Sequence, residues 1–225
     1  MNVRLQIIFF SIFFFCAGGP LSEAVDGEKI FYNINPFGKS EYIDQGTVSL
    51  EGKELRAASF HTRIIGFDDA EKIYTDPVTG LPVRIERTIR WPFNREFIVE
   101  EYDQEHFTLI MRKYKGKKLI EEHKSVHNGP IYSAIVFPFS LRHVPDPQIG
   151  WKTKTAFPNE FEITLVSIDE VKVQAGHFTA YHFTSAPHKF EIWISRDKNL
   201  IPVKIQGRGT FGGYTMKLHK YVPAP

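Results

Sequence analysis

The clearest match to a chemical motif in this sequence is a glycine-rich string near its carboxyl end. Residues 207–212 read GRGTFG and fit the GxGxxG pattern, whose glycines let a backbone loop approach a dinucleotide phosphate. That use requires a strand before the loop and a helix N-terminus after it, so that free N–H groups meet the phosphate. Here Tyr214, Met216 and Leu218 alternate with polar residues, which is typical of a strand. We therefore interpret the glycines as a hairpin turn and predict no cofactor.

Histidines, acids and nucleophiles show no catalytic spacing either. His123 and His127 are four residues apart, as ligands on one helix face would be, but their segment is typical of a strand end and contains no HExxH motif. No GxSxG elbow marks a serine nucleophile. The paired acids Asp68-Asp69 and Glu100-Glu101 are interpreted as solvated charges at a turn and on alternating strand faces. We predict no metal site, no catalytic residue and no enzymatic activity.

The positive signal is the aromatic content, with 20 Phe, 9 Tyr and 3 Trp. Several segments are apolar on both faces, among them 135–139, 178–183 and 190–194. A curved sheet with an apolar concave face forms a pocket for a lipid-sized ligand, although the same residues also suit a filled core. The predicted pocket wall, chosen by aromatic type and strand position, comprises Phe137, Phe139, Trp151, Phe178, Tyr181, Phe183, Trp193 and Tyr214. A register slip of one residue would turn a strand's side chains to the other face.

Short strands must position these aromatic residues. From residue 27 onward, apolar and polar residues alternate in short runs, separated at intervals of about 8–12 residues by turns rich in Gly, Pro, Asp and Asn. In the run 83–91, Val83, Ile85, Ile89 and Trp91 share one side, and Arg87 interrupts that apolar side. The pattern predicts a mainly β fold of about eleven to thirteen strands, an antiparallel meander forming a strongly curved half-barrel or open barrel.

One short helix is expected within this meander. The run 128–130, Asn-Gly-Pro, can cap a helix and place proline in its first turn. Ile131, Ala134 and Ile135 follow at the i, i+3 and i+4 spacing of a helix face. We expect this helix to end before Pro138.

The first 24 residues have the parts of a secretory signal peptide. Arg4 supplies the positive region, an apolar run covers 5–16, and Ser22-Glu23-Ala24 is a small-x-small cleavage site. The apolar run is shorter than the roughly 20 residues of a transmembrane helix. We predict cleavage after Ala24, export of the protein, and a single β domain over 25–225.

Cysteine content and net charge indicate which crosslinks and partners to expect. Cys16 follows Phe14 and Phe15 rather than the small residues that precede a lipoprotein acylation site, and it is interpreted as part of the removed peptide, which leaves a mature chain without disulfides. The formal net charge is only +2, so nucleic acid is not an expected partner. The densest basic cluster, Lys113, Lys115, Lys117 and Lys118, surrounds Gly116. We interpret it as a solvated hairpin tip rather than as a patch for anionic lipid or nucleic acid.

Short motifs along the mature chain resemble those of a bacterial envelope family catalogued as domain of unknown function 3108. They are residues 27–32 (GEKIFY), 76–77 with 80–82, 132–134 to 141–142, 175–180 (AGHFTA), 192–197 and 201–205 (IPVKI). The resemblance implies a periplasmic, mostly antiparallel β protein. It also implies a curved sheet similar to that of the lipoprotein carriers LolA and LolB, and no established catalytic residues.

Two functions of different classes follow from these observations. In the first, an exported envelope protein binds a lipid, an acyl chain or a lipidated protein on the concave aromatic face of its sheet. In the second, a structural or interaction protein with a filled core binds an envelope protein or a glycan through its surface. A membrane surface stays open as a partner, although the mature sequence contains no transmembrane segment. An enzyme is a third reading and would need His, Asp or Glu side chains converging in one cleft.

Overall fold

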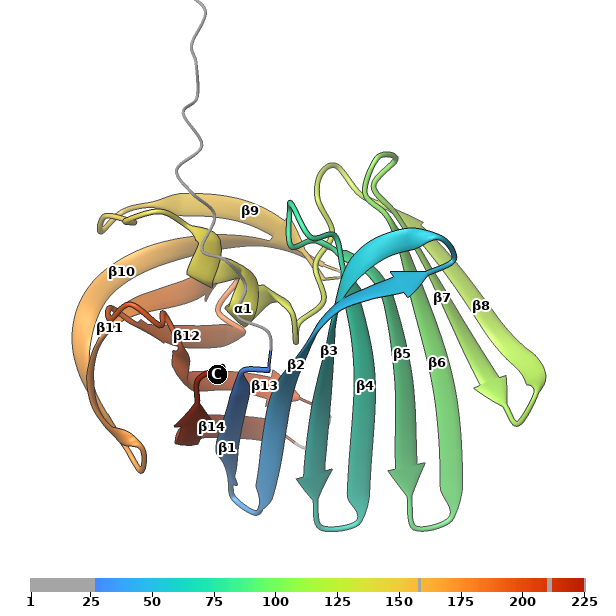
Figure 1. The fold of residues 1–225 in the computed structure, drawn as a ribbon, viewed down its shortest axis with the longest axis horizontal. Helices are drawn as coiled ribbons and strands as arrows, with labels where there is room; N and C mark the ends of the chain where they lie inside the picture. The colour runs from blue at the N-terminus through green and yellow to red at the C-terminus, as the bar shows by residue number, and fades with distance from the viewer. Residues whose placement is uncertain (1–26, 158, 210–211, 225) are drawn as a thin grey trace, which may run out of the picture.

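A computed structural model describes residues 27–157, 159–209 and 212–224, which form one antiparallel sheet of 14 strands (Figure 1). In chain order the strands are β1 (Lys29–Asn35), β2 (Gly38–Leu50), β3 (Lys53–Ile64), β4 (Phe67–Thr75), β5 (Pro82–Trp91), β6 (Asn94–Asp103), β7 (Thr108–Lys115), β8 (Lys118–Val126), β9 (Lys152–Ala156), β10 (Glu160–Val173), β11 (Gly176–Ala186), β12 (Phe190–Ser195), β13 (Pro202–Gly209) and β14 (Gly212–Val222). The helix α1 (Phe137–Ser140) and the 3-10 helix η1 (Leu141–His143) lie between β8 and β9.

The strand order confirms the predicted open meander. It runs from β8 down to β1 and then from β14 down to β9. The first and last strands of the chain, β1 and β14, therefore pair with each other inside the sheet. The edge strands β8 and β9 do not pair with each other, and the sheet stays open. The predicted signal peptide, with Cys16 and its cleavage site, lies outside the described residues.

Alternation of side chains gives the strands two chemically different faces, as the sequence predicts. In β5, Ile85 and Ile89 are buried on the inner face. On the outer face, Arg84 donates to Glu101 at 3.0 Å and Arg112 donates to Glu122 at 2.6 Å, so ion pairs cross β5 to β8. The inner face is therefore the one that carries the core and the cavities described below.

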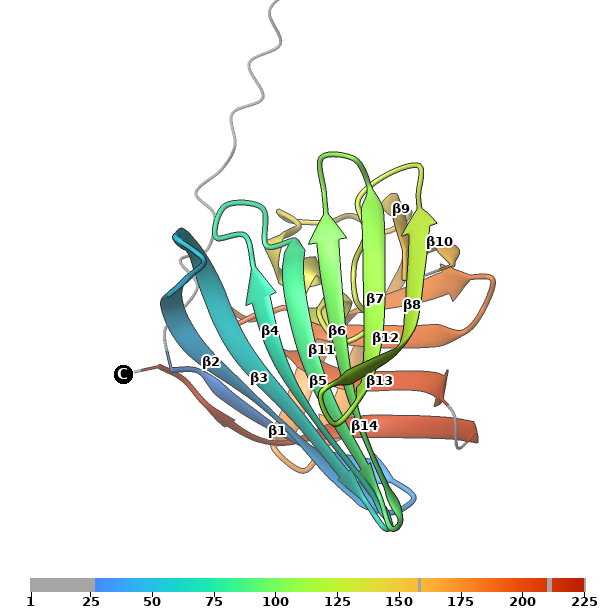
Figure 2. The same cartoon turned by 90° about the vertical axis from the view of Figure 1, so that its right-hand side faces the viewer.

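Tight turns join the strands where the sequence places its turn residues. The carboxylate of Asp76 accepts hydrogen bonds from the backbone N–H groups of Val78 at 3.0 Å and Thr79 at 2.7 Å. Gly80 follows with a φ of 68°, a conformation that glycine adopts without steric cost. The turns between β1 and β2, β3 and β4, and β5 and β6 all lie at one end of the sheet, seen at the bottom of Figures 1 and 2.

The helix differs in position from the sequence prediction. Ile131 forms an isolated bridge to Ala156, and the helix begins at Phe137 rather than ending before Pro138. The prediction was wrong because Pro138 occupies the first turn of the helix, where its missing N–H costs no hydrogen bond. Ser133 redirects the preceding segment, since its Oγ accepts hydrogen bonds from the N–H groups of Ile135 and Val136, both at 3.2 Å.

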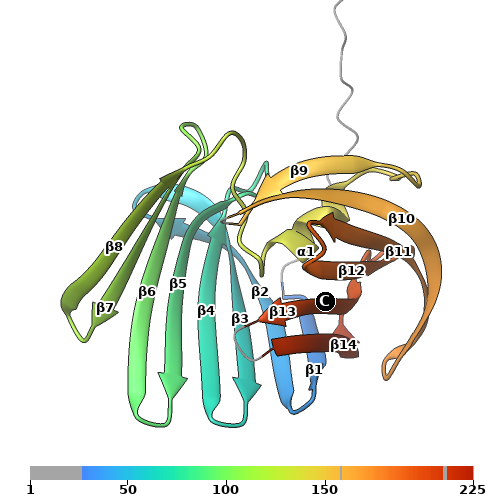
Figure 3. The same ribbon diagram turned by 180° about the vertical axis from the view of Figure 1, so that it is seen from behind.

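The sheet curves so strongly that its two halves face each other across α1 (Figures 1 and 3). We call β1–β8 the N-terminal half and β9–β14 the C-terminal half. The core is densest in the C-terminal half, where Leu165, Phe183, Ile192 and Val203 are at most 1% exposed. Within the described residues, no helix has the length and apolar character needed to cross a membrane.

Candidate functional site

A cavity of about 650 Å³ opens on the concave face of the N-terminal half. Strands β3–β8 form its wall, the β13–β14 hairpin borders it, and the segment 132–135 with Phe157 covers it. Its lining is mainly apolar and includes Phe60, Ile64, Leu109, Met111, Tyr132 and Met216. A cavity of this size and character is typical of sites for small molecules.

One part of the wall is charged. Strand pairing places Glu71 on β4 opposite Arg87 on β5. Arg87 Nε lies 2.9 Å from both carboxylate oxygens of Asp69, and its Nη2 also donates to Asp69. The same Nε lies 3.4 Å from Glu71 Oε1. On the next strand, the Tyr102 hydroxyl donates to Glu100 Oε2 at 2.5 Å.

We call these five side chains, Asp69, Glu71, Arg87, Glu100 and Tyr102, the polar cluster; all five line the cavity. The cluster holds three carboxyl groups against one guanidinium. Asp69 and Glu71 are nearly inaccessible, with residue exposures of 5% and 6%. Burial raises the pKa of Glu71 to about 8, an effect larger than the opposing attraction of Arg87.

The protonation of Glu71 decides what the cluster can do chemically. Because burial raises its pKa, Glu71 keeps its proton to a higher pH than an exposed glutamate does; the protonated carboxyl group can donate a hydrogen bond, whereas the ionised carboxylate only accepts. Among the described residues no hydrogen bond to Glu71 is formed, although the ion pair with Arg87 is present. Glu71 is therefore available to bind a hydroxyl, amine or carbonyl group of a molecule in the cavity.

The cluster corrects the interpretation of two acids, Asp69 and Glu100, as solvated charges; Glu100 lines the cavity and accepts the Tyr102 hydrogen bond. Asp69 was expected to be a solvated turn charge beside Asp68, but the β3–β4 turn ends at Phe67, so Asp69 lies within β4 and faces inward. Sequence reasoning also missed Glu71. The signal that could have found both is Arg87, which interrupts the apolar side of β5 and needs buried carboxylates as partners.

The predicted pocket wall is divided between different environments. Tyr214 lines the cavity. Phe139 lines a second cavity of about 340 Å³ beside Arg142. Phe137 contacts the rings of Phe157 and Phe190 within the core.

The other five predicted wall residues lie in β9–β14 or just before it. Trp151 meets the buried Phe183 edge to face at 6.0 Å, and Tyr181 is also buried. Phe178 is partly buried against the core. Trp193 stacks on His182 at 4.1 Å and donates its Nε1–H to Asp169. Of the eight residues, the structure thus brings Tyr214 to the 650 Å³ cavity, and the binding role of the set stays a prediction.

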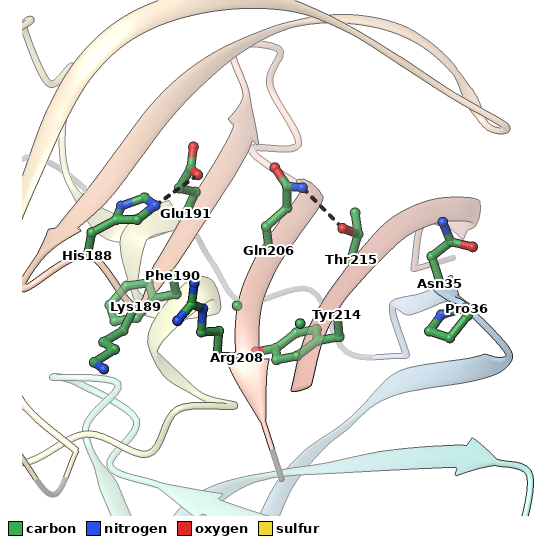
Figure 4. Close-up of a pocket in the computed structure, with 12 residues that line it drawn as sticks. Asn35, Pro36, His188, Lys189, Phe190, Glu191, Gln206, Arg208, Tyr214 and Thr215 are labelled. Atoms are coloured by element: carbon green, nitrogen blue, oxygen red, sulfur yellow. Dashed lines mark hydrogen bonds and ion pairs between the residues drawn. The ribbon is translucent and has the colours of Figure 1, made fainter. Parts of the chain in front are cut away.

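A third, more polar pocket of about 390 Å³ adjoins the first (Figure 4). Gln206 donates to Thr215 Oγ1 at 3.1 Å, and His188 lies 3.4 Å from Glu191. The Tyr214 ring lies over Gly207, where a Cβ atom would come within 2.7 Å of the Tyr214 hydroxyl. A side chain at position 207 would therefore displace the Tyr214 ring. The antiparallel pairing of β13 with β14 confirms the hairpin interpretation of the GxGxxG string.

The two histidines with helix-like spacing are separated by the strand geometry. His123 lies on β8 and lines the cavity, opposite Met111. His127 follows the strand and contacts Ser125 Oγ at 2.9 Å. Within the part of the chain that the structure describes, no group of three or more His, Cys, Asp or Glu side chains could hold a metal ion.

Comparison with solved structures places this architecture among known β folds. A β-barrel-like protein of domain of unknown function DUF1849 from Brucella abortus has a TM-score of 0.53 and 11% identity, covering 90% of this chain and all of the other. A putative exported protein with YmcC-like fold from Bacteroides fragilis has a TM-score of 0.30 and 10% identity, covering 88% of this chain and 96% of the other. The first likeness supports the fold alone.

Comparison of sequences gives the family. A search of curated proteins finds no match. The profile described as "Protein of unknown function (DUF3108)" matches residues 32–219, which include all 14 strands except the first residues of β1 and the last of β14. The resemblance seen in the short motifs is thereby confirmed, and this chain belongs to the DUF3108 family.

Proposed function

We propose that this protein is a non-enzymatic envelope protein that binds an amphipathic, mainly apolar ligand in the 650 Å³ cavity. The cavity itself carries the proposal, because its apolar wall suits an acyl chain or a similar group. The polar cluster suits the opposite end of such a ligand, since Glu71 can exchange a hydrogen bond with a hydroxyl, amine or carbonyl group.

The place of action that we propose is the periplasm, reached through the signal peptide predicted at residues 1–24. The partners would be a lipid, an acyl species or a lipidated protein. Uptake of such a ligand from a membrane surface is part of this proposal.

Native mass spectrometry tests the proposal. The protein is purified from a periplasmic fraction without detergent and compared with two variants on one strand. Met111 lines the cavity, and Met111→Trp fills part of it; Ile110 points to the other face of β7, and Ile110→Trp is the matched control. We expect an added mass of a lipid or acyl species on the wild type and on Ile110→Trp, and its loss from Met111→Trp. The protein mass also tests cleavage after Ala24.

A wild-type protein that stays bare after incubation with envelope lipids would contradict the proposal. It would favour the alternative, an interaction protein, which one observation supports. Strand β8 is an edge strand that is exposed on both faces, with Leu119 and Ile120 at 44% and 49% exposure. An open edge of this kind can pair with a strand of a partner protein.

A further inference from the structure

Three neighbouring hairpin tips at one end of the sheet each present a large apolar side chain to solvent. Phe37 lies between β1 and β2, Ile65 between β3 and β4, and Phe93 between β5 and β6. Their exposures are 68%, 84% and 101%. Because β1 to β6 are consecutive in the sheet, these tips stand in a row, at the bottom of Figures 1 and 2. We call Phe37, Ile65 and Phe93 the rim.

The opposite end of the same strands shows that apolar tips are not a general property of this sheet. There the turns are Glu51-Gly52 between β2 and β3, residues 76–81 between β4 and β5, and residues 104–107 between β6 and β7. Val78 is exposed in the second of these turns, but the tip residues Glu51, Glu105 and His106 are polar and exposed. Single exposed apolar residues are ordinary, whereas three on adjacent tips form a patch that marks an interaction surface.

Positive charge accompanies the rim. The next tip in the row, between β7 and β8, carries Lys115, Lys117 and Lys118, all exposed. Lys39 and Arg95 lie beside the first and third tips and are also exposed. Within the described residues these five cations form no ion pair.

Two of the acids at this end of the sheet are already paired, whereas Glu121 on β8 is exposed and forms no ion pair among the described residues. Asp68 accepts a hydrogen bond from Arg90 at 3.0 Å. Glu96 pairs with Lys113 at 2.9 Å. The surface around the rim therefore has an excess of unpaired positive charge, which is complementary to an anionic partner.

The rim also borders the cavity. Phe37 and Ile65 line the 650 Å³ cavity, together with Pro36 and Phe67 beside them. A surface that contacts the rim would therefore lie at the mouth of the cavity.

We propose that the rim docks on the surface of a membrane that contains anionic lipids. Phe37, Ile65 and Phe93 enter the boundary between headgroups and acyl chains, where aromatic and aliphatic side chains are favoured. The lysines of the fourth tip remain among the headgroups and are attracted by their negative charge, so the proposal gives this tip an anionic-lipid contact that its sequence alone did not favour. This combination of a small apolar insertion and a basic patch gives reversible binding, because neither element alone anchors a protein stably.

Flotation with lipid vesicles tests the proposal. The mature protein is mixed with vesicles of equal parts phosphatidylcholine and phosphatidylglycerol, or of phosphatidylcholine alone. We expect binding to the anionic vesicles that weakens as salt is added. The triple variant F37S/I65S/F93S should lose about tenfold or more of this binding. The variant K115Q/K117Q/K118Q should bind about tenfold more weakly and lose most of the salt dependence.

A matched control removes other apolar side chains that are at least 62% exposed and lie away from the rim. Val78, Val126 and Ile149 are 68%, 70% and 62% exposed, and V78S/V126S/I149S should bind as the wild type does. Equal binding by the rim variant and this control would overturn the proposal. Failure of the wild-type protein to bind anionic vesicles would also overturn the proposal, and a protein would then be the better assignment for the partner of the rim. Met111→Trp should still bind vesicles although it loses the cavity ligand. The proposal for membrane docking and the proposal for ligand binding can therefore fail independently.

Discussion

The two halves of the sheet present apolar side chains on their concave faces with different results. In the C-terminal half, Phe183, Ile192 and Val203 are fully buried, and the rings of Phe137, Phe157 and Phe190 pack together above them. In the N-terminal half, Leu109 and Met111 are only partly buried and face a cavity. The difference does not come from the strands, which have the same alternation in both halves.

The segment that joins the halves causes the difference. Residues 127–151 include α1, which contacts β13 in the C-terminal half and whose Phe139 stacks on Tyr42 of β2 at 4.1 Å. In the N-terminal half the same segment covers the cavity only through residues 132–135. A strongly curved sheet therefore becomes a filled core only where another segment occupies its concave face, and elsewhere it leaves room for a ligand.

Substitutions in the two halves of the sheet measure this contrast most directly. Phe183→Ala removes a ring from the filled half and should reduce the free energy of unfolding by about 3–5 kcal/mol. Met111→Ala shortens a side chain that already borders empty space, and should cost about 1 kcal/mol or less. Urea unfolding followed by circular dichroism compares them. Equal losses would show that the N-terminal half is as tightly packed in solution as the C-terminal half.

The sequence predicts the fold well because its signals are local. Period-two alternation specifies which side chains share a face, and Gly, Pro and Asp specify where a strand must end. Both depend on neighbours along the chain, so the open antiparallel meander was predictable. The helix was placed too early because the Ser133 hydroxyl, bonding to Ile135 and Val136, competes with helix formation there.

The site was predicted poorly because it depends on distant segments. Whether an aromatic residue faces a cavity or a filled core depends on where residues 127–157 lie, and no local pattern contains that information. Of the predicted wall, Tyr214 reaches the cavity, while Phe183 lies under Trp151 in the filled half. The polar cluster combines β4, β5 and β6, and Arg87 was its one visible sign in the sequence.

The second contrast is between buried and exposed ion pairs. Arg142, in η1, donates to both oxygens of Glu28, at 2.7 and 2.9 Å, and to the carbonyl of Asn199 at 2.8 Å. It thereby ties the joining segment to both halves of the sheet. Arg142→Met leaves the Glu28 carboxylate, 4% exposed, without its partner and should cost about 3 kcal/mol.

The matched control for this pair is Arg112→Met on the outer face, which removes solvent-exposed pairs with Glu101 and Glu122. We expect a much smaller loss there, because water screens exposed charges. Urea midpoints of both variants test this, and E28Q/R142M should recover part of the stability lost by Arg142→Met. If the two single variants lost the same stability, the Arg142–Glu28 ion pair would contribute no more to stability than the exposed pairs of Arg112.

The smallest expected effect concerns the pH dependence of the cavity half. Glu71 has a pKa near 4.5 in an unfolded chain, and burial raises it to about 8 in the folded protein. The folded state therefore holds the proton more tightly, so this contribution to stability is complete below pH 4.5 and is lost as the pH rises through 8. We expect a loss of at least about 1 kcal/mol between pH 5 and 8.

Glu71→Gln keeps the shape of the side chain and removes its titration, so the loss of stability between pH 5 and 8 should disappear in this variant. Urea midpoints measured across that range test it, with Glu86→Gln on the outer face as the control that keeps the wild-type slope. An unchanged slope in Glu71→Gln would mean that Glu71 is ionised in the folded protein at neutral pH. The polar cluster would then offer a ligand only acceptors and the Arg87 guanidinium, and a cationic amine would become the better fit to its charge.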